Sequence, residues 1–334
     1  MSTSSPVEAS YDFTAYNEVV GASLATELVG GSAACAAAVR ESFTALDAAL
    51  AAGGAPAKAA SAALNSCQDL SAASPLDVMW GASNAAGVFQ GLVQYNDEGG
   101  SLDIRAVCQI MANASATPIE RLATAVRAAS GPSCIDNNYS DYVVTAGNTT
   151  ADKAARGLGL RQWMWQSCSQ FAYWQTCEDR AVCPLSLYMT LESNTRQCAD
   201  LFGAAFTAAV SEERVKNTNA LYGGDRIAST RTIFVNGRID PCAVPRAFPR
   251  APPRRARNAT SRTPNTPTQR APRIPKGTRS PCSTRARRRS PSSSTAPRTA
   301  ARCSRRARLT RPRSRPRARR SPRSLSCGCK DFWE

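Results

Sequence analysis

The sequence TRTIFVNGRIDP, which runs from Thr230 to Pro241, joins a strand pattern to an acidic residue. Residues 232–235 are β-branched or aromatic, and Asn236-Gly237 follows them as a turn signal. This pattern predicts a short buried strand that ends in a tight turn. Asp240 lies just past the turn, where a carboxylate at the edge of an α/β sheet can orient a catalytic histidine. An Asp before a proline is also a common turn-capping residue, and the spacing alone favours that interpretation.

Three stretches carry a resemblance to a known family. Residues 234–242 read FVNGRIDPC where the family has F-x-N-G-x-x-D-P-W, so Cys242 replaces a tryptophan. Residues 163–177 read WMWQSCSQFAYWQTC and are similar to W-x-Y-Q-T-C-T-E-F-G-x-Y-x-T-C. Ser5-Pro6-Val7, with the DF and YNEVV that follow it, is similar to S-A-P-V…D-F…Y-x-x-V-V. From about residue 4 to 241, the chain resembles serine exopeptidases of the prolyl carboxypeptidase, dipeptidyl peptidase II and thymus-specific serine protease type.

The resemblance implies an α/β fold, with a partial α/β-hydrolase core, a large helical cap insertion and a disordered basic tail. Residues 1–11 would follow the nucleophile region, and residues 12–160 would form the cap. Residues 161–241 would form part of the hydrolase core and end at the triad acid, and residues 242–334 would form the tail.

The same resemblance implies a serine-type exopeptidase that cleaves peptides with a proline near the scissile bond. Asp240 would be the triad acid, and a homodimer is one expected assembly. Trp163 and Tyr173 would line the pocket for the substrate proline, although aromatic residues of this kind more often pack in a core. Gln170 and Ala172 replace the usual Glu and Gly of the family, which changes the expected local geometry and substrate contacts.

Histidine is absent from all 334 residues. This absence excludes a Ser-His dyad, a Cys-His dyad and any His-ligated metal site built by this chain alone, and we expect no metal and no cofactor. Ser32 lies in a sequence similar to a nucleophile elbow, but Ala34 stands where the second glycine is needed, so Ser32 is predicted to be a helix N-cap. In the family the elbow precedes the segment that matches Ser5. We therefore expect the chain to begin after the nucleophile and to be catalytically incompetent as it stands.

Eight cysteines before Asp240 show no Cys-x-x-Cys spacing and predict disulfides in an oxidising compartment, with 105 pairings formally open. They are Cys35, Cys67, Cys108, Cys134, Cys168, Cys177, Cys183 and Cys198. N-glycosylation sequons occur at Asn113, Asn138 and Asn148. These features predict handling in the secretory pathway, with a lysosomal or extracellular destination. No signal peptide and no membrane-spanning segment is apparent. Because a disulfide-rich chain without an export signal is inconsistent, we expect the true N-terminus to lie upstream of Met1.

Charge divides the chain into two unlike parts. Residues 1–241 hold 15 Lys and Arg against 23 Asp and Glu, a net charge of −8, whereas residues 242–334 hold 27 against 2, a net charge of +25. The second part is rich in Arg, Pro and Ser and lacks apolar periodicity, which predicts disorder. A GC-rich gene read out of frame would give the same composition. An alternative function is therefore a non-catalytic helical fragment whose basic tail binds polyanions without specificity for a nucleic-acid sequence.

Start and stop signals predict that residues 12–130 are mainly helical. Ser32 precedes a helix over residues 33–51, Ser74-Pro75 starts a second, and Thr117 with Glu120 forms a capping box for a third that ends near residue 129. A further short helix is predicted to start near Ser211. Residues 177–198 are predicted to be rich in loops.

Overall fold

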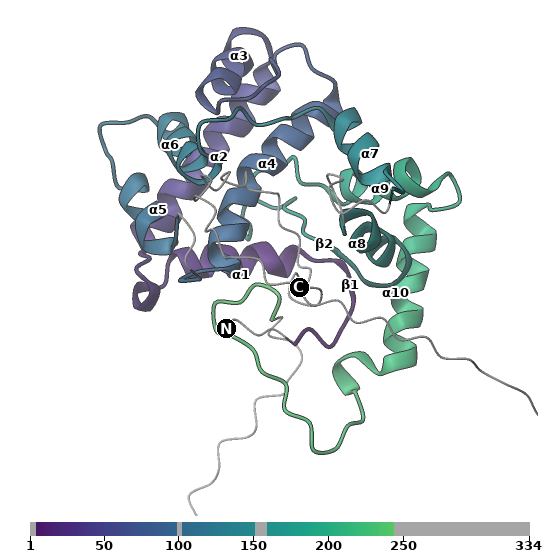
Figure 1. Ribbon diagram of the computed structural model, residues 1–334. Coiled ribbons are helices and arrows are strands. Elements are labelled where there is room, and N and C mark those ends of the chain that lie inside the picture. The colour runs from purple at the N-terminus through teal and green to yellow at the C-terminus, as the bar shows by residue number, and fades with distance from the viewer. Residues whose placement is uncertain (1–4, 99–101, 151–158, 244–334) are drawn as a thin grey trace, which may run out of the picture. The chain divides into compact units, whose positions relative to one another are not determined.

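The computed structural model describes residues 5–98, 102–150 and 159–243, and Figure 1 shows these residues as helices with one small sheet. The first group of helices comprises α1 (Thr14–Leu24), α2 (Ala33–Ala52), α3 (Gly54–Ala63), α4 (Pro75–Gln94), α5 (Ile104–Met111) and α6 (Pro118–Ser130). The second group comprises α7 (Tyr139–Gly147), α8 (Leu160–Gln166), α9 (Leu191–Phe202) and α10 (Ala208–Tyr222). A π-helical turn, Ser167–Phe171, follows α8, and short 3-10 helices span Glu27–Val29 (η1) and Gly224–Arg226 (η3).

The sheet consists of two parallel strands, β1 (Ser10–Asp12) and β2 (Ala172–Trp174). Ser10 pairs with Ala172 and Asp12 pairs with Trp174. The pairing joins segments about 160 positions apart in the sequence. It therefore fixes the start of the described chain against the segment that follows α8.

Side-chain caps start the helices where the sequence predicted them. The Ser32 hydroxyl accepts a hydrogen bond from Cys35 N at 3.0 Å, which confirms that Ser32 is an N-cap. Capping boxes pair Ser74 with Asp77 at the start of α4 and Thr117 with Glu120 at the start of α6. Each box satisfies backbone N–H groups that the first helical turn leaves without intrahelical partners. The prediction that residues 12–130 are mainly helical is confirmed.

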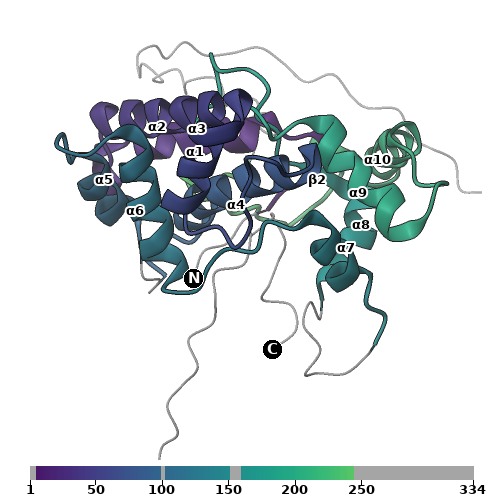
Figure 2. The ribbon, with the colours of Figure 1, turned by 90° about the horizontal axis from the view of Figure 1, so that it is seen from above.

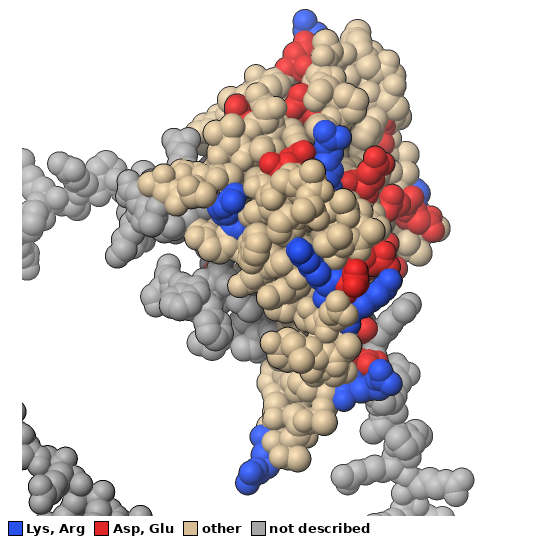
Figure 3. Space-filling model, turned by 90° about the vertical axis from the view of Figure 1, so that its right-hand side faces the viewer, with Lys and Arg blue, Asp and Glu red and all other residues tan. Residues whose placement is uncertain are grey.

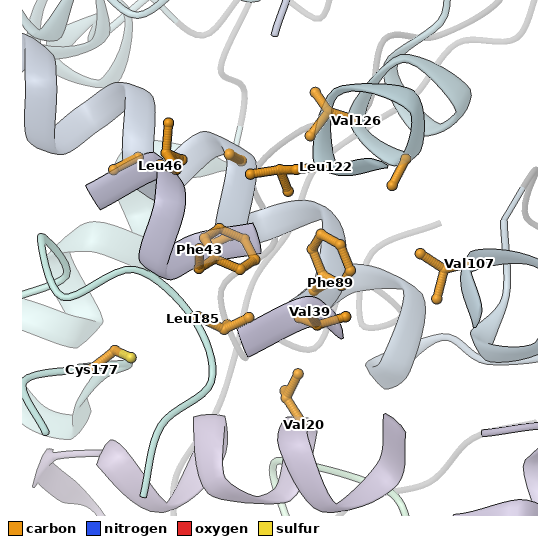
Figure 4. Packing of buried hydrophobic residues seen from close by; sticks show 14 of the residues in the cluster. Val20, Val39, Phe43, Leu46, Phe89, Val107, Leu122, Val126, Cys177 and Leu185 are labelled. Carbon is orange, nitrogen blue, oxygen red and sulfur yellow. The ribbon is translucent and has the colours of Figure 1, made fainter. Parts of the chain in front are cut away.

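Helices α1 to α6 enclose the larger of two hydrophobic clusters (Figure 4). At its centre Phe43 of α2 meets Phe89 of α4 edge to face, with ring centroids 5.4 Å apart, and neither ring is exposed to solvent. Leu185 and Cys177 reach the same cluster from the segment between β2 and α9. A segment more than 80 residues downstream of α4 thus completes the core of the first helical group.

The second cluster joins β1 and β2 to helices α7 to α10, which Figure 2 shows grouped together. Met164, Trp174, Leu201 and Val215 are among its buried residues. At the junction of α4, α7 and α9, the rings of Trp80 and Tyr142 lie 4.2 Å apart, measured between centroids. The Tyr142 hydroxyl also donates to Gln197 Oε1 at 2.6 Å, and burial raises the pKa of this phenol.

Four disulfides pair all eight of the cysteines that precede Asp240, and the sequence had left this pairing open. The bonds are Cys35–Cys108, Cys67–Cys134, Cys168–Cys198 and Cys177–Cys183. The first joins α2 to α5, the second joins the α3–α4 connection to the α6–α7 connection, and the third joins the π-helical turn to α9. None of the helices in the described ranges combines the length and the apolar character required to cross a bilayer.

An ion pair fixes the short disulfide loop to α2. The Arg180 guanidinium pairs with the Asp47 carboxylate, which also accepts hydrogen bonds from the Ser186 hydroxyl and, at 2.9 Å, from Leu187 N. Burial raises the pKa of Asp47 above its usual range, although Ser186, Leu187 and Arg180 each act in the opposite direction. Desolvation of the carboxylate therefore raises its pKa by more than these three partners lower it.

One sequence-based prediction of local structure is wrong. Residues 232–235 form an irregular segment in which Ile233 is 87 % and Val235 51 % exposed, whereas a buried strand was predicted. A β-branched run becomes a strand only when a neighbouring strand takes its backbone hydrogen bonds, and the described sheet contains only β1 and β2.

The predicted loop-rich connection over residues 177–198 is confirmed as far as residue 190, and its remaining residues lie in α9, which begins at Leu191. The last helix starts three residues before Ser211, capped by Thr207, because the Thr207 hydroxyl accepts from Val210 N at 3.3 Å. Residues 244–334, where the disordered tail was predicted, lie outside the described ranges.

Candidate active site

Asp240 lies in a tight turn and is only 5 % exposed. Its Oδ1 accepts a hydrogen bond from Cys242 N at 2.9 Å, and its own N–H donates to Gly237 O at 3.3 Å. The carboxylate thus caps its own turn, as the simpler interpretation of the sequence predicts, while also being buried. A Cβ added to Gly237 would lie 3.2 Å from the Asp240 Cβ, so a side chain at that position would require Asp240 to shift by a few tenths of an ångström.

Helix α1 borders the Asp240 turn. Ser23 Oγ lies 3.5 Å from Ile239 O, and Ile239 packs against the larger hydrophobic cluster. Tyr16, in the same helix, is fully buried and donates to Gln94 Oε1 at 2.8 Å. Burial raises the pKa of Tyr16 well above its usual value, and the charges of Tyr95 and Asp240 add to the increase. The Asp240 carboxylate therefore contributes to the electrostatic field at a buried hydroxyl.

Residues 5–9 are held against this region by side chains from distant parts of the chain. Asn236, in the segment that leads to Asp240, accepts a hydrogen bond from Ser5 N at 2.8 Å. Asn219 of α10 pairs with both backbone groups of Ala9, accepting from its N–H and donating to its carbonyl oxygen, each at 2.8 Å. The segment that matches the family pattern near Ser5 is therefore placed beside the loop that carries Asp240.

A polar network lies between the end of β2 and helix α1. The Thr176 hydroxyl donates to Asp12 Oδ1 and lies 2.7 Å from the Thr14 hydroxyl. The Asn17 side chain donates to Thr176 O at 2.9 Å and accepts from Gln90 Nε2 at 2.9 Å. Sequence reasoning missed these residues, because polar residues buried within a helical pattern are recognised only when their partners are known.

The two predicted pocket residues lie in different clusters. Trp163 is half-buried and packs against the second cluster, whereas Tyr173 packs against the larger one. The Tyr173 ring lies 5.4 Å from that of Phe13, and its hydroxyl donates to Glu8 O at 3.2 Å. Tyr173 therefore contacts the N-terminal segment at Glu8, whereas Trp163 packs against the second cluster.

Strained backbone marks the end of the π-helical turn. Ala172 and Tyr173 both adopt positive φ values, 54° and 58°. An L-residue in this region costs about 1–2 kcal/mol, which glycine avoids. The resembling family has glycine at the position of Ala172, so the departure noted in the sequence falls where the backbone is least suited to a side chain.

The sequon asparagines differ in exposure. Asn113 and Asn148 are exposed, and their Oδ1 atoms accept from the backbone N–H two residues later, at 3.1 and 2.9 Å. Asn138 is half-buried and caps α7 by accepting from Asp141 N at 3.2 Å. Across residues 5–98, 102–150 and 159–243, no group of three or more Cys, Asp or Glu side chains is arranged to hold a metal ion.

Comparisons with known proteins agree with the resemblance seen in the sequence. Residues 1–245 match the family described as serine carboxypeptidase S28. The chain is 32 % identical over 257 residues to the thymus-specific serine protease of Mus musculus, covering 73 % of this chain and 48 % of that protein. The human thymus-specific serine protease is also 32 % identical, over 253 residues, with the same coverage.

The chain thus spans about half the length of these curated relatives. No solved structure matches it. Because the match to the family covers most of the chain, the protein belongs to the serine carboxypeptidase S28 family of serine proteases.

Proposed function

We propose that this chain carries part of the catalytic apparatus of a serine-type exopeptidase that acts on peptides with a proline near the cleaved bond. The observation that supports the proposal most is the placement of Asp240, which is buried in a turn four residues after Asn236, whose side chain accepts a hydrogen bond from Ser5 N. The family resemblance places residues 5–9 shortly after the nucleophile. An acid and a nucleophile of one triad must approach a common histidine, so their flanking segments are expected to lie side by side.

The role of Asp240 in this reaction is to orient and stabilise. In a Ser-His-Asp hydrolase the serine attacks the peptide carbonyl and the histidine accepts the serine proton. The acid then holds the histidine in the correct tautomer and stabilises its charged form. This sequence contains no histidine, so its own residues supply the acid and part of the surrounding scaffold. Tyr173, whose hydroxyl reaches Glu8 O beside that scaffold, is the better supported of the two pocket candidates.

Cleavage of a prolyl peptide by this chain alone is therefore expected to stay at background. The purified 334-residue protein should neither hydrolyse prolyl peptides nor become labelled by a fluorophosphonate, because a serine needs an adjacent base for activation. The mouse thymus-specific serine protease serves as a positive control for labelling. Stoichiometric labelling of any serine in this chain, Ser32 included, would contradict the proposal.

The expected environment follows from the disulfides. Four bonds join all eight cysteines before Asp240, and disulfides persist in oxidising compartments. We place the protein in the secretory pathway, with the lysosome or the cell exterior as its destination, and a homodimer is the assembly proposed for it.

A second candidate function rests on the charge of residues 242–334, which is +25. On the face of the described residues in Figure 3, basic and acidic side chains are interspersed, with no continuous basic patch. In this candidate function residues 242–334 bind the polyanion, and the logarithm of the affinity falls linearly with the logarithm of the salt concentration. Competition between unrelated DNA, RNA and heparin ligands tests this candidate, which predicts no preference. A preference of about a hundredfold would require positioned base contacts.

A further inference from the structure

The segment from Ile227 to Arg238, between η3 and the Asp240 turn, is presented to solvent. All of its side chains are exposed except that of Phe234, which is half-buried. Backbone hydrogen bonds anchor its two ends, from Ile227 N to Gly224 O and from Asp240 N to Gly237 O, both at 3.3 Å. Figure 1 shows this segment in green as a loop that leaves the end of α10. Exposed loops of this kind are the preferred sites of proteolytic cleavage.

Basic residues within the described ranges are distributed unevenly with respect to this segment. Arg226, Arg231 and Arg238 lie in it or at its edge. Every other described Lys or Arg lies in an α-helix, except Arg180, which is inside the Cys177–Cys183 loop and paired with Asp47. An endoprotease of trypsin-like specificity needs an Arg or Lys side chain for its acidic pocket, on a backbone that can extend through its cleft. A helical backbone meets the second condition only after local unfolding.

Of the three arginines, Arg231 is the most accessible on both sides. Arg226 ends the η3 turn, and Arg238 is followed by Ile239, which packs against the larger cluster, and then by buried Asp240. Residues 227–230 and 232–233 are all exposed. Thr232 and Ile233 are β-branched and favour an extended backbone.

Backbone strain also favours this position. Arg231 has a φ of 59°, in the left-handed region that is costly for a residue with a Cβ. Extension of the segment in a protease cleft would return Arg231 to the β region and remove that cost. At Arg231, the conformation bound to the protease therefore has less backbone strain than the free conformation.

We propose that the Arg231–Thr232 peptide bond is a processing site for an endoprotease of trypsin-like specificity. In the cleavage, water supplies a hydroxyl to the Arg231 carbonyl carbon and a hydrogen to the Thr232 nitrogen as the C–N bond breaks. The products are a carboxylate at Arg231 and a new amino terminus at Thr232. The cleavage separates α10 from the loop that carries Asp240, and it does not depend on the proposed peptidase function.

Limited trypsin digestion of the full native chain tests the proposal. New amino termini are labelled and identified by mass spectrometry at successive times, so that cleavage beyond residue 243 is counted separately. We expect the Thr232 terminus to appear at least about tenfold faster than the terminus after Arg105, which is exposed but helical. The variant Arg231→Gln removes this terminus, and the matched variant Arg105→Gln leaves its rate unchanged.

Two results would overturn the proposal. One is cleavage after Arg105 or another helical residue as fast as cleavage after Arg231, or a first cut after Arg226 or Arg238. The other comes from the reduced, unfolded chain, in which we expect the tenfold preference to disappear. If the unfolded chain were still cleaved preferentially after Arg231, the preference would come from the local sequence and not from the folded structure.

Discussion

Replacement of Asn219 by alanine removes the side chain that holds the N-terminal segment. Asn219 makes two hydrogen bonds of 2.8 Å to the backbone of Ala9, which is 7 % exposed. Each such bond contributes about 1 kcal/mol net, and a buried backbone group left without its partner costs about 1–3 kcal/mol. Water that enters the opened site can partly replace these hydrogen bonds, which lowers the total cost of the substitution. We therefore expect Asn219→Ala to lower the free energy of unfolding by about 2–4 kcal/mol.

Urea denaturation with the disulfides intact, followed by tryptophan fluorescence, measures this change. Asn217→Ala is the matched control, because Asn217 is an exposed asparagine in the same helix and its replacement should cost less than about 0.5 kcal/mol. Hydrogen exchange at the Ala9 amide supplies a local readout that should accelerate in the Asn219 variant only. Equal stability of the two variants, with the Ala9 amide still protected, would show that the Asn219 hydrogen bonds do not hold the N-terminal segment.

Three further predictions concern the core, the buried acid and the sequons. Phe89→Ala should destabilise the chain by about 3–5 kcal/mol in the same assay, whereas Leu221→Ala, at a side chain 76 % exposed, should stay within about 0.5 kcal/mol. Because burial raises the pKa of Asp47, its contribution to stability is full below the unfolded pKa, near 3.9. That contribution is lost as pH rises through the folded value. Stability of the Asp47→Asn variant should lack this pH-dependent component, and identical pH profiles for both proteins would contradict it. Expression in a eukaryotic secretory host should add glycans at the exposed Asn113 and Asn148, so Gln substitution at each should remove one glycan mass, and an unchanged mass would exclude that site.

The helices of residues 12–130 could be predicted because their signals are local. Ser32, Ser74 and Thr117 each contact a backbone N–H three residues away, so the cap is encoded within one helical turn. The cysteines could be assigned to disulfides from their number and spacing. Their pairing depends on which helices pack together, and that information is not local.

The failures have physical causes that also depend on distant partners. The residues around Ile233 have strand propensity, but no described strand lies beside them to complete a ladder. For the candidate site, the sequence identified Asp240 through a family motif but did not predict that Asn236 and Asn219 hold residues 5–9 in place. Hydrogen bonds between residues more than 200 positions apart leave no periodic pattern in the sequence.

We propose that Asp240 is the acid of a serine exopeptidase triad, and a chimeric enzyme can test this role. Residues 5–241 of this chain replace the matching part of the mouse thymus-specific serine protease, which supplies the rest of the enzyme. Hydrolysis of prolyl peptides is then compared between this chimera and its Asp240→Asn variant, with Asp225→Asn as a control at a partly exposed carboxylate. We expect activity in the chimera, a loss of kcat by about 10⁴-fold in the Asp240 variant and little change in the control. An active chimera that keeps its kcat after Asp240→Asn would show that Asp240 is not the triad acid.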